Sequence, residues 1–320
     1  MGTTDLSDFP VPEVPEAFQA PNLRHVVLHG FPCLIQSRLH PSAASLVRLR
    51  LTSITRPPFF YFLPNDLLQL ISCLTRLESL EIFVPSRGFD THTPITAHIT
   101  LHNLRFFSFQ GIGAYLEAVV CRITTPRLEN LHIKLGSFDQ LPFSVPRLVE
   151  HLRFDAALIK FNDDGIHVGT YFLEANTFAF FVNARCWLHA DEQASSVAQR
   201  LSPVLSAVEH LALRHEVHGQ SSDNDVDRTE WRELLMSLSN VKTLLVEDGL
   251  IEELSRCLRL EEGELPLELL PKLQELTYFR SGDAGNPFVS FIDSRQNAGR
   301  PVTLRVDNQE QTPSLRSRIL

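Results

Sequence analysis

The segment RLESLEI, residues 76–82, carries the pattern that decides the fold of this chain. Three bulky apolar residues, Leu77, Leu80 and Ile82, stand in the order L-x-x-L-x-Φ, where Φ is any bulky apolar residue. The last two are two positions apart, so in a strand their side chains point to the same side of a sheet. The first enters the strand from a turn and is expected to pack beneath it. The segment therefore predicts a short strand with one buried face.

The same pattern occurs nine times along the chain, once with an extra residue. The copies are Leu23-Val26-Leu28, Leu46-Leu49-Leu51, Leu77-Leu80-Ile82, Leu104-Phe107-Phe109, Leu128-Leu131-Ile133, Leu148-Leu152-Phe154 (the copy with the extra residue), Val208-Leu211-Leu213, Val241-Leu244-Val246 and Leu273-Leu276-Tyr278. A tenth, partial copy lies in PVTLRV, residues 301–306. Successive copies start 23, 31, 27, 24 and 20 residues apart, then 60, then 33 and 32. This spacing overlaps the ~20–29 residues that are typical of leucine-rich repeats.

Segments with helical periodicity separate these strands. They are LLQLISCL after the Asx cap Asn65-Asp66, GAYLEAVVCRI (113–123), DRTEWRELLMSLS from the capping residue Asp227, LIEELSRCLRL after Gly249, and NPFVSFIDSRQN (286–297). Because strand and helix alternate with short connections, the strands are expected to be parallel and the helices to cover one face. Each unit buries its apolar residues only against its neighbours. The sequence therefore predicts an α/β leucine-rich-repeat-like solenoid with a curved parallel sheet and outer helices.

The solenoid is expected to span residues 20–306. An extended or disordered lead-in precedes it at 1–19, and a C-terminal tail follows it at 307–320. The repeats are irregular at about 155–205, where GIHVGTYFLE (165–174) and NTFAFFVNA (176–184) are predicted to be strands. They form either two degenerate repeats, which we favour, or a hairpin excursion that turns near residues 174–176.

Composition and charge exclude several classes of function. The net charge of −9 and the pI of about 5.8 argue against nucleic-acid binding, because neutralising phosphates requires a surplus of Lys and Arg. No CxxC pair occurs among the five cysteines, so they are expected to be buried free thiols in a reducing compartment rather than zinc ligands. No signal peptide and no apolar run of ~18 residues is found. We therefore expect no membrane contact and a cytoplasmic or nuclear location.

A search for catalytic residues yields one remote alternative. Gly111 and Gly113 lie between a predicted strand and a predicted helix, where a dinucleotide-binding loop would place them. Leu116 occupies the third glycine position, so we interpret the two glycines as part of a repeat turn. A nucleotide-dependent enzyme that uses this turn remains the alternative. Otherwise no catalytic, cofactor or metal site is predicted, and the protein is expected not to be an enzyme.

The strand pattern does predict a binding face. Residues between the apolar anchors point to the opposite, concave side of the sheet. The candidates for partner binding on this side are His25, Arg48, Arg50, Phe106, Asn130, His132, His151 and Arg153. Basic groups beside an aromatic ring suit an acidic or phosphorylated protein target, because Arg pairs with carboxylate or phosphate through two hydrogen bonds.

Several phrases resemble the leucine-rich-repeat region of basidiomycete fungal F-box proteins. They include APNLRHVVLHGF, ITTPRLENLHI, LSAVEHLAL, LSNVKTLLVEDGL and FIDSRQNAGRPVTL. The resemblance covers roughly residues 20–304 and implies the target-recognition part of a ubiquitin-ligase receptor. In such receptors an F-box ahead of the repeats binds the ligase adaptor.

The F-box itself is not found in this chain. LPNDLLQLI (63–71) superficially resembles its opening, but a repeat strand begins six residues later, so we interpret the segment as a helix between repeats. A ubiquitin-ligase adaptor is therefore expected as a partner only if an F-box is present elsewhere. The alternative is a stand-alone repeat scaffold that is unconnected with ubiquitin.

Overall fold

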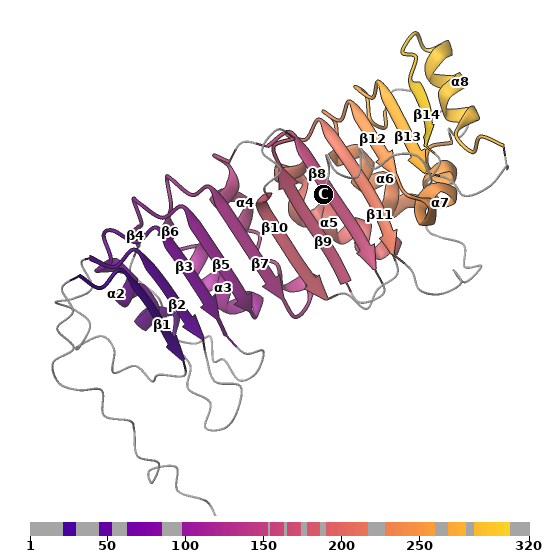
Figure 1. The fold of residues 1–320 in the computed structure, drawn as a ribbon. Helices are drawn as coiled ribbons and strands as arrows, with labels where there is room; N and C mark the ends of the chain where they lie inside the picture. Colours follow the sequence, from indigo (N-terminus) through magenta and orange to yellow (C-terminus); the bar gives the residue numbers. More distant parts are fainter. Residues whose placement is uncertain are drawn as a thin grey trace, which may run out of the picture.

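The computed structural model describes residues 22–29, 45–52, 63–84, 98–152, 154–162, 165–173, 178–185, 190–216, 228–259, 268–279 and 285–307. In this part of the chain one long sheet of twelve strands is backed by helices on a single face (Figure 1). The strand order is β1-β2-β3-β5-β7-β10-β9-β8-β11-β12-β13-β14. The fold is the predicted α/β, leucine-rich-repeat-like solenoid. The lead-in at 1–19 and residues 308–320 of the tail lie outside the described residues.

Eight copies of the pattern and the partial tenth copy form strands where they were predicted. These strands are β1 (His25–His29), β2 (Arg48–Thr52), β3 (Ser79–Phe83), β5 (Phe106–Gly111), β7 (Asn130–Leu135), β11 (His210–Glu216), β12 (Thr243–Val246), β13 (Glu275–Phe279) and β14 (Thr303–Asp307). Along β2, Arg48 and Arg50 are exposed whereas Leu49 and Leu51 are buried. The first apolar residue of each copy packs beneath the sheet, as Leu77 and Leu104 show. The alternation predicted from the sequence is confirmed.

Hydrogen bonds tie each repeat to the next in a constant register. The carbonyl of Arg24 accepts the N–H groups of both Val47 (2.8 Å) and Arg48 (2.9 Å). The same forked bond recurs one repeat later, where the carbonyl of Val47 accepts from Glu78 and Ser79, and again at Glu78, Arg105, Asp155, Glu209 and Lys242. As a result, equivalent residues of neighbouring repeats stand side by side in straight rows across the sheet.

Helices and short ribbons connect the strands. The helices are α2 (Pro64–Ser72), α3 (Gly113–Val120), α4 (Val145–Val149), α5 (Ala190–Leu205), α6 (Arg228–Ser237), α7 (Ile251–Cys257) and α8 (Val289–Asn297), with 3-10 turns η3 (Phe138–Gln140) and η4 (Asp248–Leu250). A separate two-stranded sheet pairs β4 (Ile99–Thr100) with β6 (Ile123–Thr124). These helices include all five predicted segments.

The predicted cap of the first helix is wrong. Helix α2 begins at Pro64 with Leu63 at the N-cap, and no side chain caps it. Proline favours the first helical position because its φ is already helical and it lacks an N–H that would be unpaired there. The helix therefore starts before Asn65 and Asp66 can cap it. The predicted cap of α6, Asp227, lies outside the described residues.

The expectation of buried thiols is only partly met. Of the three described cysteines, Cys257 is buried whereas Cys73 and Cys121 are exposed. Cys73 and Cys121 occupy the C-cap positions of α2 and α3, where the helix leaves its packed face.

One strand prediction in the middle of the chain is wrong. The sixth copy does not form a strand, because Val145–Val149 is helix α4 and residues 150–151 are a turn. Pro146 stands in the first turn of α4, and Leu148 and Leu152 are four positions apart, which is helical rather than strand spacing. The strand that follows, β8, starts only at Ala156.

The irregular stretch forms an antiparallel meander instead of degenerate repeats. Strands β8 (Ala156–Asn162), β9 (Gly165–Tyr171) and β10 (Phe178–Arg185) follow one another, and β9 is antiparallel to both neighbours. The favoured interpretation is therefore wrong, and the hairpin alternative is confirmed. A connection of two residues between β8 and β9 is too short for the crossover that parallel neighbours need.

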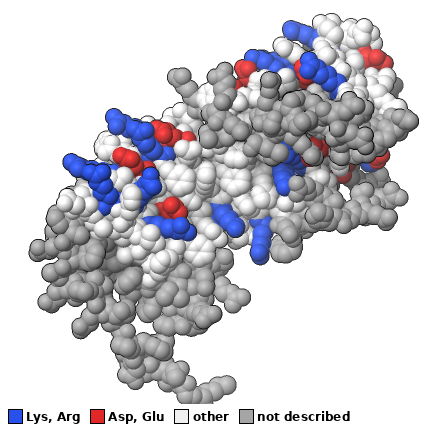
Figure 2. All heavy atoms as spheres, viewed as in Figure 1, with Lys and Arg blue, Asp and Glu red and all other residues white. Residues whose placement is uncertain are grey.

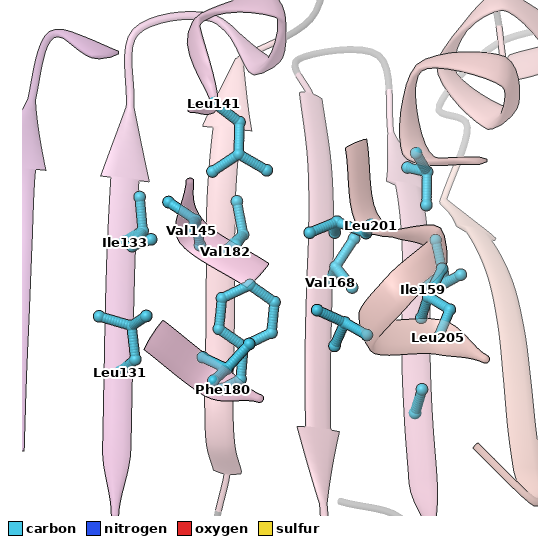
Figure 3. Close-up of a cluster of buried hydrophobic side chains, with 14 of the residues drawn as sticks. Leu131, Ile133, Leu141, Val145, Ile159, Val168, Phe180, Val182, Leu201 and Leu205 are labelled. Atoms are coloured by element: carbon cyan, nitrogen blue, oxygen red, sulfur yellow. The ribbon is translucent and has the colours of Figure 1, made fainter. Parts of the chain in front are cut away.

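The meander joins the two runs of repeats. Strand β10 pairs parallel to β7, and β8 pairs parallel to β11. The core continues beneath it, as Figure 3 shows: Leu131 and Ile133 of β7 lie beside Phe180 and Val182 of β10, and Val145 of α4 packs against them. Val168 of β9 and Ile159 of β8 extend the same core toward Leu201 and Leu205 of α5.

Replacing Phe180 should therefore weaken the whole molecule. Its ring is 0% exposed in the core between β10 and the helices, so Phe180→Ala leaves a cavity and should lower the free energy of unfolding by about 3–5 kcal/mol. Chemical denaturation measures the change. The matched control is Phe143→Ala: this ring is 66% exposed and stacks only on Arg200, so its loss should cost less than about 1 kcal/mol. Equal losses in the two variants would contradict the placement of Phe180.

Candidate functional site

The side of the main sheet opposite the helices is the candidate site, and we call it the open face. In Figure 1 the sheet lies in front of α3, α5 and α6, so this side faces the viewer. It is formed by residues that alternate with the buried anchors, from Arg48 and Arg50 on β2 to Phe181 on β10. Because the register is constant, these residues form rows that run across the strands.

Exposed arginines occupy the N-terminal part of the open face. Arg48 lies in a row between His25 of β1 and Ser79 of β3. Arg50 lies in the next row, where its Nε is 3.6 Å from a carboxylate oxygen of Glu81. The side chains of this pair are 56% and 40% exposed, and such exposed pairs contribute little and exchange partners easily. Both guanidinium groups therefore remain accessible to a ligand.

The middle of the open face carries a row of rings. Phe106 of β5 lies edge-on to His132 of β7, with ring centroids 5.2 Å apart, and His132 lies edge-on to Phe181 of β10 at 5.9 Å. Phe178 continues the row at 5.5 Å from Phe181, and His167 of β9 approaches Phe181 at 6.3 Å. We call these five residues the aromatic row. All four of these contacts have centroid distances that favour ring–ring attraction.

Two further residues hold the end of the aromatic row. Phe178 lies over Gly169 of β9, where an added Cβ would collide with its ring, so glycine leaves the space that the ring fills. Tyr171 of β9 stands edge-on to Phe178 at 5.6 Å and is 4% exposed. Burial raises the pKa of the Tyr171 hydroxyl to about 12, so it stays protonated at neutral pH. At this end of the aromatic row, Phe178 is therefore packed against uncharged groups.

Burial also decides the charge of His132. Its position between two phenyl rings removes water from the imidazole and lowers the pKa of His132 below the ordinary value of 6.5. The ring is consequently neutral at pH 7. His132 thus contributes a polar ring to the open face rather than a positive charge.

Basic side chains border the aromatic row toward the C-terminal ends of the strands. Lys134 is two residues beyond His132 on β7, and Arg185 ends β10; both are exposed. A row in register continues from Lys134 through Asn183 and His167 to Lys160. No Asp or Glu occupies an open-face position on β5, β7, β8, β9 or β10 as far as these strands are described. Figure 2 shows the result, an uncharged band with Lys and Arg side chains along its lower edge.

The structure brings most of the predicted candidates onto this surface. His25, Arg48, Arg50, Phe106, Asn130 and His132 all lie on open-face positions of β1, β2, β5 and β7. His151 does not: it lies in the turn after α4, where its Nε2 is 3.0 Å from the carbonyl oxygen of Leu128. The prediction for His151 is wrong because its segment forms a helix and a turn instead of a strand. Arg153 lies outside the described residues.

Sequence reasoning missed Phe178, Phe181 and His167. Each belongs to the meander, whose order in the sheet was not predicted. A signal was present, since Asp164-Gly165 is a strong hairpin dipeptide.

The glycine pair that suggested a nucleotide site has a packing explanation. A Cβ on Gly111 would lie 2.7 Å from the carbonyl oxygen of Val84, and one on Gly113 would collide with the backbone of Gln140. The N–H of Gly113 points to the side-chain oxygen of Gln140 at 3.4 Å. The start of α3, where a phosphate would bind, is therefore filled by the η3 turn.

Comparisons with known proteins add two likenesses of fold. No protein-family model matches the chain, and neither does any curated protein. A crystal structure of a TLR13–ssRNA13 complex is similar over 92% of this chain and 37% of that chain, at 15% identity and a TM-score of 0.35. The leucine-rich repeat-containing protein LegL7 from Legionella pneumophila is similar over 93% of this chain and 89% of its own, at 11% identity and a TM-score of 0.36. This chain thus spans little more than a third of the TLR13 chain.

Two further searches cover the described part of the chain. None of its helices has the length and apolar character needed to cross a bilayer. Within the same residues, no three His, Cys, Asp or Glu side chains gather in a way that would hold a metal ion.

The packing role of Gly113 is testable. Gly113→Ala should lower the free energy of unfolding by about 1–3 kcal/mol, because the methyl group forces α3 away from Gln140. Gly285→Ala is the control, since nothing lies within 4 Å of its Cβ position and its effect should stay within about 0.5 kcal/mol. Thermal melting with and without nucleotide measures both points. A stable Gly113→Ala protein, or a nucleotide-dependent rise in melting temperature, would contradict this interpretation.

The state of His132 predicts a pH effect on stability. Its pKa in the folded protein is lowered by burial, whereas in the unfolded chain it returns to about 6.5. The stability that the neutral ring contributes is therefore complete above pH ~6.5 and is lost as the pH falls toward the folded-state pKa.

Denaturation of wild type and His132→Phe at pH 7 and pH 5 measures this effect. The wild type should lose more stability than the variant between these two values, because the phenyl ring does not titrate. Equal losses of stability in the two proteins would show that folding does not lower the pKa of His132.

Proposed function

We propose that this chain is a non-enzymatic recognition module that binds a protein segment on its open face. One observation carries the proposal: rings and basic groups stand on the side of the sheet that the described helices leave free. Aromatic residues and arginine are the side chains that most often dominate protein–protein binding energy. A sheet whose strands are tied in constant register holds such side chains at fixed spacings, so little order has to be gained on binding.

The chemistry of the open face favours an acidic or phosphorylated target. Arg48 and Arg50 lie on one strand, two positions apart and on the same side. Each offers a planar fork of donors that fits a carboxylate or a phosphate. The chain as a whole has a net charge of −9, so a basic surface on this face is a local feature and not an average property. It would draw acidic segments to the open face while the rest of the molecule repels them.

The finer proposal is that the chain forms the target-recognition part of an F-box-type ubiquitin-ligase receptor in the cytoplasm or nucleus. Its support is the resemblance of the repeat phrases over roughly residues 20–304 to fungal F-box proteins. In such a receptor the open face would hold the target, and an F-box elsewhere would hold the ligase adaptor. The alternative, a stand-alone scaffold unconnected with ubiquitin, uses the same face in the same way.

A pair of charge reversals tests the general proposal. Arg48→Glu with Arg50→Glu should weaken binding to an array of acidic and phosphorylated peptides at least tenfold, because both forks are replaced by repelling carboxylates. The control pair is Arg147→Glu with Arg300→Glu, which makes the same change in charge at exposed positions on α4 and after α8. It should bind like the wild type. Unchanged binding by the Arg48 and Arg50 variant would refute the proposed role of the open face.

A second measurement separates the two finer alternatives. Purified chain is mixed with the cullin-ligase adaptor, and a complex is sought by size-exclusion chromatography. Adaptor binding would support the receptor and would show that an F-box is present in the chain. Absence of a complex, with peptide binding intact, would favour the stand-alone scaffold or the target half of a longer receptor.

A further inference from the structure

We infer that the aromatic row is an anchor site for a hydrophobic side chain that stands two residues from an acidic one in an extended partner segment. This inference rests on the proposed function and names the feature of the partner that the middle of the open face would select. It concerns residues of β5, β7 and β10 and is independent of the two arginines on β2.

The first argument is the packing of the rings. Phe106, His132 and Phe181 meet edge-to-face across three strands, and Phe178 meets Phe181 at a tilt. All four rings are partly buried rather than extended into solvent. Their rotamers are thus held before a ligand arrives. A preorganised apolar surface loses little conformational entropy when it binds.

The second argument is that this packing does nothing for the main core. Phe106, Phe178 and Phe181 belong to neither buried cluster, whereas their strand neighbours Phe107 and Phe180 are 0% exposed beneath the sheet. The three phenyl rings lie on the face that the described helices do not cover, and they leave part of their apolar area exposed. Binding of a hydrophobic side chain would remove that area from water.

The third argument is the position of the charge. Lys134 follows His132 on the same side of β7 after one intervening residue, which places it about 7 Å further along the strand. An extended segment that lies along the strand has the same repeat. A hydrophobic side chain over the ring of His132 would therefore bring the side chain two residues away to Lys134.

The charge pattern selects the acidic sign for that second side chain. The described open-face positions of the five middle strands hold no carboxylate, so the charged groups that an acidic side chain meets there are basic: Lys134, Arg185 and, further along the row, Lys160. A single-stranded nucleic acid also stacks on rings beside basic groups. We favour the protein segment because the net charge of −9 repels a polyanion, and nucleic-acid binding is an outcome that the experiment distinguishes.

The experiment compares two variants on matched peptides. The probes are extended peptides that share one flanking sequence and contain Phe-x-Asp, Ala-x-Asp or Phe-x-Asn, with an oligonucleotide as the fourth probe. Wild type should bind Phe-x-Asp at least tenfold more tightly than the other three. Phe181→Ala should lose this preference for Phe over Ala, and Lys134→Glu should lose the preference for Asp over Asn.

Controls separate a lost site from a lost fold. Phe106→Ala removes the end of the row, where only one ring neighbour depends on it, and should reduce binding of Phe-x-Asp in the same direction. Phe143→Ala, an exposed ring beside α4, should change nothing. Each variant is used only where its melting curve shows a cooperative transition.

The outcomes distinguish this inference from the proposed function. Loss of binding on reversing Arg48 and Arg50, with wild-type behaviour of Phe181→Ala and Phe106→Ala, would leave the proposed function in place and overturn the anchor site. Wild-type behaviour of all these variants would overturn both. Tighter binding of the oligonucleotide than of any peptide would overturn the anchor site for a protein segment as well.

Discussion

A forked hydrogen bond at the start of most repeat strands is the interaction on which the rest of the structure depends. One carbonyl, such as that of Arg24 or Glu209, accepts two successive N–H groups of the adjacent strand. A second bond at this place leaves no freedom to shift the register, and a shift of one residue would turn every side chain to the opposite face. The leucine rows beneath the sheet follow from this alignment, and so does the placement of Phe106 beside His132 in the aromatic row.

Much of the fold could be predicted because its determinants are local. Leu77, Leu80 and Ile82 lie within six residues, and the same spacing identifies the other repeat strands without reference to anything distant in the chain. The meander could not be found in this way. Strand β8, AALIKFN, contains no copy of the pattern, and its place in the sheet depends on pairing with β11, which is far away in the sequence. Local spacing also misled at Leu148 and Leu152, where a helix satisfies it.

The residues of the candidate site likewise fall into those that the sequence could place and those that it could not. Arg48, Phe106 and His132 could be assigned to one face because alternation along a strand is enough to decide it. That Phe181 stands beside His132 could not, since it requires β10 to pair with β7 across an intervening helix and two strands. The neutral state of His132 has the same origin, because the burial that lowers its pKa comes partly from Phe181.

The antiparallel strand β9 has a consequence for how the molecule assembles. In a regular repeat array each unit touches only the next, so structure can start anywhere and spread along the chain. Here β7 pairs with β10, and β8 pairs with β11, and in each pair the two strands lie far apart in the sequence. Neither run of repeats can pair its inner edge strand, β7 or β11, until these distant segments meet. The meander therefore raises the contact order of a linear repeat array to that of a globular domain. We expect slower and more concerted folding as a result.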